Sequence, residues 1–173
     1  MVAERSWMLS EIASITRGRL IGADTRVVGV STDSRSQPTG AVFFALTGPT
    51  FDGHEYVDSA LAAGASGVVV ASGRVDLEPR VEVGDPLEAL RALAVDARSH
   101  MSQPVIAVTG STGKTSTKDL LASALPGAHA SARSFNNEIG VPLTVLAANP
   151  DASVLVLEVG SRGAGHIEHL APV

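Results

Sequence analysis

The stretch that decides the fold is VIAVTGSTGKTSTKDLLASAL, residues 105–125. Its first four residues are apolar, as in a buried strand, and its last dozen predict a helix that Pro126 and Gly127 end. A glycine-rich turn lies between the two. A strand, a glycine loop and a helix in this order are typical of the start of a doubly wound α/β domain.

The glycine-rich turn is a candidate phosphate site because backbone N–H groups at glycines and at a helix N-terminus can converge on phosphate oxygens. Its residues are Thr109, Gly110, Ser111, Thr112, Gly113, Lys114, Thr115 and Ser116. Lys114 is predicted to reach the β- and γ-phosphates of a nucleotide, and the Thr115 hydroxyl to bind Mg²⁺. The motif departs from the strict G-x-x-x-x-G-K-[ST] pattern, because Val108 stands where the first glycine belongs. Only two residues of the chain are lysines, Lys114 and Lys118, which favours a specific role over a surface lysine.

Glu158 is the second candidate residue. It lies in an apolar run that predicts a buried strand over residues 154–159. A carboxylate in such a strand is costly unless it is paired or binds a metal. Because parallel strands end at one edge of a sheet, we expect Glu158 beside the phosphate loop, holding Mg²⁺ directly or through water.

Two adjacent amides, Asn136 and Asn137, precede a helix expected over residues 142–148. They could contact a phosphate, a metal shell or a substrate. On spacing alone, the simpler interpretation is that these two residues belong to a loop and cap the helix that follows.

The residues before 102 predict a separate small α/β unit, so the expected domains are 1–101 and 102–173. Ser10 is a possible cap of the first helix, and Asp85 is expected to cap the last. The segments 32–36 and 52–54 are polar loops beside strands and are interpreted as turns.

The expected helices cover residues 8–17, 55–63 and 85–100, and the expected strands 26–30, 41–46, 67–71 and 80–83. The second unit shows only two convincing strands, which suggests a truncated sheet.

Composition excludes several classes of protein. The net charge of −5 argues against a nucleic-acid-binding protein. The absence of cysteine excludes a disulfide scaffold and a thiol nucleophile, and makes the cytoplasm the simplest compartment. The opening MVAERSWMLSEIAS does not have the pattern of a signal peptide, and no apolar run is long enough to span a membrane.

The chain resembles the Mur ligases, ATP-dependent amide-bond-forming enzymes of bacterial peptidoglycan synthesis. Besides the phosphate loop, the resemblance is carried by three segments. They are DSRSQPTGAVFFALTGPTFDGHEYVDSALAAGASGVVV (33–70), NNEIGVPLTVL (136–146) and VLVLEVGSRGAGHIEHL (154–170). Within the family the chain is most similar to the ligases that add D-alanyl-D-alanine to UDP-N-acetylmuramoyl-tripeptide.

The resemblance implies a UDP-substrate domain followed by the first part of a central P-loop ATPase domain, with ATP and Mg²⁺ as cofactors. It places Ser34 and Arg35 near the uridine nucleotide, Asn137 near ATP and Asn136 at the substrate. Lys114 and Glu158 would be catalytic, with Thr115 and Glu158 at the metal. The peptide carboxylate would attack the γ-phosphate of ATP, and the amine would then attack the acyl phosphate. The full-length enzyme is expected to be a monomer.

Two alternatives stay open at this point. One is a related Mur ligase that adds a diamino acid to UDP-muramoyl-dipeptide, and the other is a stand-alone module that binds a nucleotide or the UDP precursor. Because Mur ligases are much longer, residues 1–173 alone are expected to be inactive.

Overall fold

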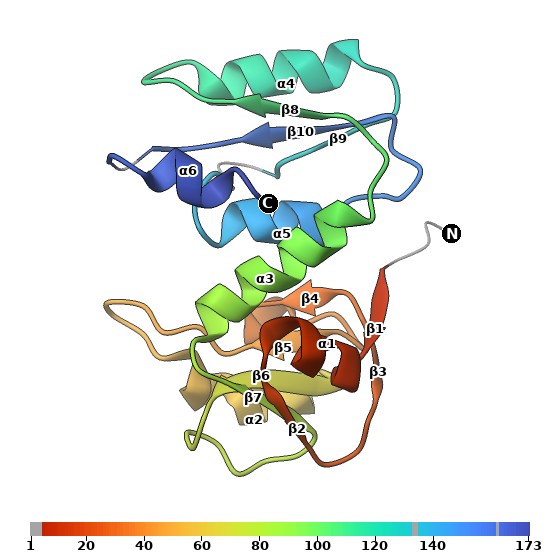
Figure 1. Cartoon of the computed structure of the whole chain (residues 1–173), viewed down its shortest axis with the longest axis vertical. Helices are drawn as coiled ribbons and strands as arrows, with labels where there is room; N and C mark the ends of the chain where they lie inside the picture. Colours follow the sequence, from red (N-terminus) through yellow and green to blue (C-terminus); the bar gives the residue numbers. More distant parts are fainter. Residues whose placement is uncertain (1–4, 133–134, 162) are drawn as a thin grey trace. The chain divides into compact units, whose positions relative to one another are not determined.

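The structure is a computed structural model that describes residues 5–132, 135–161 and 163–173, and it divides into two compact units (Figure 1). One unit ends at Leu93 and the other runs from Ala94 to Val173. The division falls within helix α3 (Pro86–Ser99), eight residues before the boundary expected at residue 102.

The first unit is built on a mixed sheet with the strand order β2–β7–β6–β5–β4. Strand β2 is antiparallel to β7, and the other neighbours are parallel. A separate antiparallel ribbon joins β1 to β3. The strands are β1 (Ser6–Met8), β2 (Arg19–Ile21), β3 (Arg26–Val28), β4 (Val30–Ser31), β5 (Val42–Phe44), β6 (Gly67–Ala71) and β7 (Arg80–Val83). The helices are α1 (Leu9–Thr16), the 3-10 turns η1 (Ser34–Ser36) and η2 (Gly53–Tyr56), and α2 (Val57–Ala62).

Strand β6 is buried on both faces, which explains its continuous apolar sequence. Val68 and Val70 point into a cluster with Phe43 and with the α2 residues Val57 and Ala60. The alternate positions face α1, since a Cβ built on Gly67 would lie 2.8 Å from the Leu9 side chain. Helices therefore cover both faces of this sheet.

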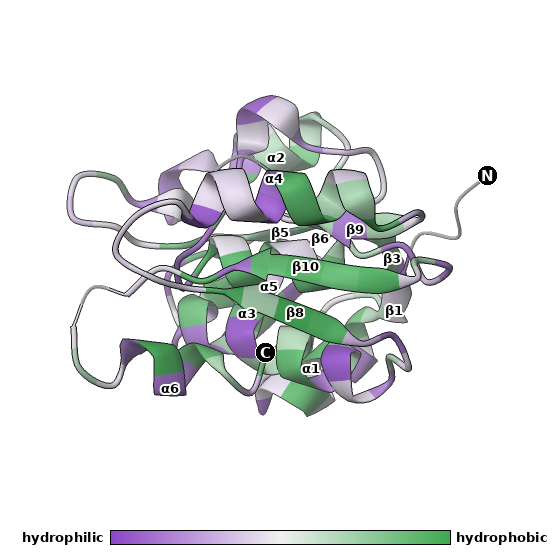
Figure 2. Ribbon diagram, turned by 90° about the horizontal axis from the view of Figure 1, so that it is seen from above, coloured by the Kyte–Doolittle hydropathy of each residue, from purple (hydrophilic) through white to green (hydrophobic). Residues whose placement is uncertain are grey.

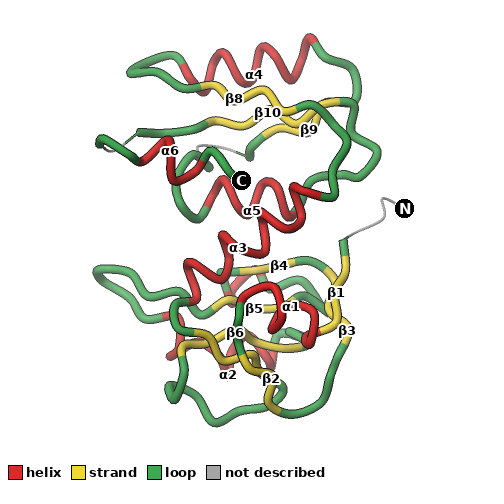
Figure 3. Tube along the Cα trace, viewed as in Figure 1, coloured by secondary structure: helices red, strands yellow, loops and turns green. Residues whose placement is uncertain are grey.

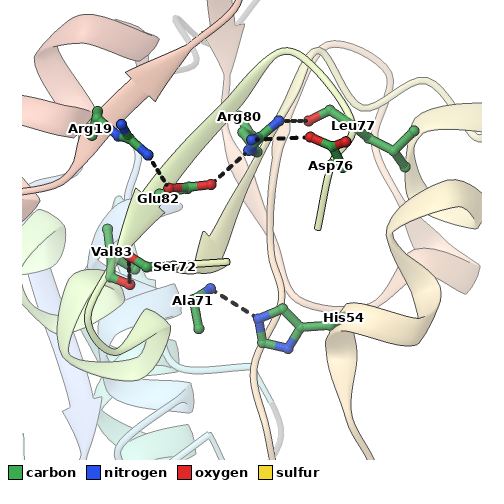
Figure 4. Close-up of polar contacts among 9 residues, drawn as sticks. All are labelled: Arg19, His54, Ala71, Ser72, Asp76, Leu77, Arg80, Glu82 and Val83. Carbon is green, nitrogen blue, oxygen red and sulfur yellow. Dashed lines mark hydrogen bonds and ion pairs between the residues drawn. The ribbon is translucent and has the colours of Figure 1, made fainter. Parts of the chain in front are cut away.

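Charged side chains are paired at the β2–β7 edge of the sheet. Arg19 lies directly opposite Glu82 in the antiparallel register and donates a 2.9 Å hydrogen bond to it, and Arg80 donates a second of 3.0 Å (Figure 4). Arg80 also contacts Asp76 at 3.5 Å and the Leu77 carbonyl. These hydrogen bonds, that from Arg19 foremost, lower the pKa of Glu82. Arg80 and Glu82 are buried, and their mutual pairing is what makes that burial tolerable.

The second unit has the parallel strand order β8–β10–β9, with helix α4 on one face and α5 and α6 on the other (Figure 1). This is the doubly wound arrangement that the sequence predicted. Figure 2 shows β8 and β10 in the green of hydrophobic residues. The central strand β10 is buried along its whole length, as expected for a strand covered on both faces, whereas the edge strand β8 is only half-buried and its Ala107 is exposed. The strands are β8 (Val105–Val108), β9 (Ala128–Ala130) and β10 (Val154–Glu158), and the helices are α4 (Lys114–Ala124), α5 (Gly140–Leu146) and α6 (His166–Leu170).

The strands predicted over 67–71, 80–83 and 105–108 are confirmed residue for residue. The single strand predicted over 26–30 is wrong, because Gly29 at φ 80° interrupts it and β3 and β4 pair with different partners. Strands β1, β2 and β9 were not predicted, since three residues are too few to show an alternating pattern.

The two predicted helix caps had different outcomes. Asp85 caps α3 as predicted, since its carboxylate accepts the Leu87 N–H at 2.8 Å. The predicted Ser10 cap is wrong. Met8 is the N-cap of α1, and its N–H donates to the Glu11 carboxylate at 2.7 Å. Ser10 lies inside the helix and donates to Asp24 instead.

Among the described residues, we find no helix with the length and apolar character needed to cross a bilayer.

We predict that Gly18→Ala destabilises the first unit by about 1–3 kcal/mol, because a Cβ there would lie 2.6 Å from the Glu82 carbonyl oxygen and 2.8 Å from Val83. Urea unfolding followed by Trp7 fluorescence measures this unit specifically, since Trp7 is the only tryptophan of the sequence and is buried in β1. Gly84→Ala is the matched control, because nothing lies within 4 Å of its Cβ position. Equal unfolding midpoints for the two variants would contradict the packing described.

Candidate functional site

The glycine-rich turn joins the end of β8 to the start of α4 (Figure 3). Gly113 is the N-cap of α4 and adopts φ 76°, and Gly110 adopts φ 149°, so both positions require the freedom of glycine. Lys114, the first residue of the helix, turns back over the loop and donates from Nζ to the Gly110 carbonyl at 2.7 Å. The loop therefore carries a positive charge at the N-terminal end of a helix dipole.

Glu158 connects three segments that are far apart in the sequence. Its side chain is 1% exposed, and both of its oxygens accept hydrogen bonds. The Thr115 hydroxyl donates to Oε2 at 2.8 Å, and Asn136 Nδ2 donates to Oε1 at 2.7 Å. The carboxylate thus lies at the carboxyl edge of the parallel sheet beside the phosphate loop, the position that the sequence predicted.

The two adjacent asparagines make different contacts. Asn136 also accepts the Gly160 N–H on its backbone carbonyl at 2.7 Å. Asn137 accepts the backbone N–H groups of Ile139 and Gly140 on Oδ1, at 3.2 and 2.8 Å, and so stabilises the start of α5. The structure brings Asn136 to Glu158, whereas the Asn137 side-chain oxygen binds the backbone before α5 and Asn137 is not among the residues that line the polar pocket described next.

These groups surround a polar pocket of about 390 Å³. It is lined by Ser111, Thr112, Gly113, Lys114, Thr115, Ser116, Asn136 and Glu158. Of the other predicted phosphate-site residues, Thr109 borders a separate apolar pocket and Gly110 supplies its carbonyl to Lys114. A hydroxyl, an ammonium and a carboxylate around a helix N-terminus suit a phosphate chain with a divalent cation.

Lys118, one turn after Lys114, supports this site and was not assigned a role from the sequence. Its side chain is only 5% exposed, and Nζ donates to the Ser131 carbonyl at 2.8 Å and contacts Asp119 at 2.8 Å. Ser131 Oγ in turn accepts the Glu158 N–H at 3.2 Å. The spacing of the two lysines and their scarcity in the sequence were the available signals.

A second pocket, of about 440 Å³, lies wholly in the first unit. It is lined by Thr32, Asp33, Ser34, Arg35, Phe43, Phe51, Gly53 and Tyr56. The predicted residues Ser34 and Arg35 belong to η1, where the Asp33 carboxylate accepts from the Arg35 backbone at 3.0 Å and from its guanidinium at 2.8 and 2.7 Å. Sequence reasoning missed the half-exposed rings of Phe51 and Tyr56.

The contacts between Asp33 and Arg35 predict a lowered pKa for the Asp33 carboxyl, which a titration can measure. Hydrogen bonds from the Arg35 side chain and backbone hold the pKa of Asp33 at about 2, below its usual value of 3.8. Because the folded-state pKa is the lower one, this pairing stabilises the unit above about pH 3.8, and the stabilisation disappears as the pH falls towards 2. We expect NMR titration of the Asp33 carboxyl to show this, and Arg35→Ala to raise the pKa only part of the way towards 3.8, because the backbone N–H at position 35 still donates to the carboxylate. A midpoint near 3.8 in the unsubstituted chain would contradict the geometry.

Lys118→Met should destabilise the second unit by about 1–3 kcal/mol, because it removes the charged donor of the buried Ser131 carbonyl. Amide hydrogen exchange of β10 measures this, and Lys114→Met, at a partly exposed position, is the control that should leave the protection unchanged. Unaltered protection in Lys118→Met would mean that the buried lysine does not hold the end of β9.

Two models of one protein family match the chain in succession. Residues 26–98 match the Mur ligase family, catalytic domain, and residues 108–173 match the Mur ligase middle domain.

Curated relatives agree with these matches. A UDP-N-acetylmuramoyl-tripeptide–D-alanyl-D-alanine ligase from Synechocystis is 38% identical over 98% of this chain, and the one from Escherichia coli is 38% identical over 92%. The chain spans 38% and 36% of the lengths of these two relatives.

Solved structures also resemble the chain. MurF from Acinetobacter baumannii superposes with a TM-score of 0.88 at 30% identity, covering 98% of this chain and 39% of that one. MurF ligase from Thermotoga maritima, in complex with ADP, gives 0.73 at 32% identity, covering 83% and 34%. A UDP-N-acetylmuramoyl-L-alanyl-D-glutamate–2,6-diaminopimelate ligase, at 20% identity and a TM-score of 0.51, shares the fold alone. With two family models matched over most of its length, and with these relatives, the chain belongs to the Mur ligase family.

Proposed function

We propose that this chain supplies the precursor-binding unit and the phosphate site of an ATP-dependent ligase that adds D-alanyl-D-alanine to UDP-N-acetylmuramoyl-tripeptide. The observation that carries the proposal is the hydrogen bond between Thr115 and Glu158, 2.8 Å long, which joins the phosphate loop to a buried carboxylate at the edge of the sheet. The relatives that bear this activity in their names match nearly the whole chain, although it spans only about 38% of their length. The activity is therefore proposed for the whole protein, in the cytoplasm.

The donor set of the polar pocket fits Mg·ATP. Lys114 carries the positive charge suited to the β- and γ-phosphates, and Thr115 offers a hydroxyl oxygen to the metal. Glu158 holds that hydroxyl and contributes the negative charge that a divalent cation needs. When bound, Mg²⁺ neutralises the charge on the phosphates. We assign Lys114 and Glu158 the catalytic roles, and Asn136 holds the second oxygen of the carboxylate.

The pocket of the first unit is proposed to bind the uridine nucleotide of the precursor. Ser34 and Arg35 line it, and the rings of Phe51 and Tyr56 offer flat apolar surface to a base. Thr32 and Ser34 add hydroxyls that can donate hydrogen bonds.

We predict that Lys114→Ala abolishes Mg·ATP binding, because the variant loses the cation that faces the phosphates. Calorimetric titration of the purified chain measures this. Binding of UDP-N-acetylmuramoyl-tripeptide by the first unit is the internal control and should be unchanged. Equal ATP affinity in the variant would remove the assignment of the phosphate loop.

The substrate pair is tested by a chimera in which residues 1–173 replace the matching segment of the Escherichia coli relative. ADP release should require UDP-N-acetylmuramoyl-tripeptide together with D-alanyl-D-alanine. Release that instead requires the dipeptide precursor and a diamino acid would favour the related ligase. A folded chimera that binds both nucleotides and never turns over would favour a binding module.

A further inference from the structure

The segment Asp52-Gly53-His54 was interpreted as a turn, and the proposed function gives it no task. In the structure His54 belongs to η2, and its ring is 4% exposed. Both ring nitrogens have partners. Nδ1 lies 2.6 Å from Asp52 Oδ1. Figure 4 shows the other contact, in which Nε2 lies 3.0 Å from the backbone nitrogen of Ala71, the last residue of β6.

These contacts fix the tautomer of His54. The Ala71 N–H can only donate, so Nε2 must accept and carries no hydrogen. Hydrogen bonds from the His54 ring and backbone, followed by that from Arg74, hold the pKa of Asp52 well below its usual range. Asp52 is therefore an ionised acceptor, and Nδ1 carries the ring hydrogen. The ring is neutral, with each nitrogen committed to one partner.

The turn is held from several sides. Asp52 also binds Arg74, in the turn after β6, and accepts the His54 backbone N–H at 3.0 Å. Gly53 donates to the Leu46 carbonyl at 2.7 Å, and a Cβ there would lie 2.6 Å from the same oxygen. The His54 ring is the only group among these that ties η2 itself to the backbone of β6.

The turn contributes two aromatic side chains to the lining of the first-unit pocket. Phe51 directly precedes Asp52, and Tyr56 is the last residue of η2. Their side chains are 49% and 46% exposed, and both line the pocket together with Gly53. The orientation of these two rings at the pocket therefore depends on a turn whose direct hydrogen bond to β6 is made by His54, beside the bonds from Gly53 to Leu46 and from Arg74 to Asp52.

We propose that His54 is a positioning residue. Its hydrogen bond with the Ala71 N–H holds residues 51–56 against the end of β6, and so keeps Phe51 and Tyr56 in place for the nucleotide of the precursor. This inference rests on the proposed function of the pocket. Without the bond to Ala71, the turn spends part of its time in other conformations, and the apparent affinity falls by the fraction that remains competent.

Two variants separate the contacts of His54. In His54→Asn, the side-chain amide can still donate to Asp52 but does not reach Ala71. In His54→Gln, the side-chain oxygen reaches the position of Nε2 and can accept the Ala71 N–H. Calorimetric titration of the 173-residue chain with UDP and with UDP-N-acetylmuramoyl-tripeptide should show affinity about tenfold weaker for Asn and within about threefold of the unsubstituted chain for Gln.

His100→Asn, at a 70% exposed ring, is the matched control and should bind like the unsubstituted chain. Undiminished affinity in His54→Asn, or equal weakening in both His54 variants, would contradict the positioning role of His54. If the unsubstituted chain binds neither uridine ligand, the proposed function of the pocket is wrong, and the positioning role of His54 is wrong as well.

The unsubstituted chain gives a second, independent test that does not require a folded variant. ¹⁵N NMR of the His54 ring should show the hydrogen on Nδ1 and an unprotonated Nε2, and the Ala71 amide should exchange slowly. A ring with its hydrogen on Nε2, or a rapidly exchanging Ala71 amide, would contradict the proposal even if UDP binds.

Discussion

The buried carboxylate of Glu158 is the interaction on which the site depends. A charge that is 1% exposed is tolerated only when its oxygens are satisfied, and here Thr115 and Asn136 satisfy one each. Because these partners come from the phosphate loop and from the segment before α5, one side chain fixes the positions of both relative to β10. Lys118 acts similarly at the neighbouring strand, because its buried ammonium donates to the Ser131 carbonyl directly after β9.

Each unit contains a buried charged or polar side chain that joins the end of a strand to a loop, and that loop carries proposed binding residues. In the second unit Glu158 holds the loop that carries Lys114. In the first, the His54 ring holds the turn that carries Phe51 and Tyr56. When fully paired, such groups constrain geometry more sharply than apolar packing, because a displaced loop leaves buried partners unsatisfied.

The sequence predicted the parts of the fold that have strong local patterns. The apolar runs of β6 and β8 were sufficient to locate those two strands, and the glycine loop was sufficient to indicate the proposed phosphate site. The short strands β1, β2 and β9 could not be found, because their three residues form strands only through pairing with distant partners. The position of Glu158 followed from its place in a buried strand, whereas the pairing of Asn136 with it depends on how the loop folds. The Ser10 cap failed because Asp24, fourteen residues away, binds Ser10.

We propose above all that the pocket around Thr115 and Glu158 binds a magnesium nucleotide. The most direct test is NMR mapping of the ¹⁵N-labelled chain with a non-hydrolysable ATP analogue, with and without Mg²⁺. We expect chemical-shift changes in the amides of residues 110–116 and 158–160, and these changes should be larger when Mg²⁺ is present. Shifts confined to other surfaces, or none at saturating ligand, would contradict it.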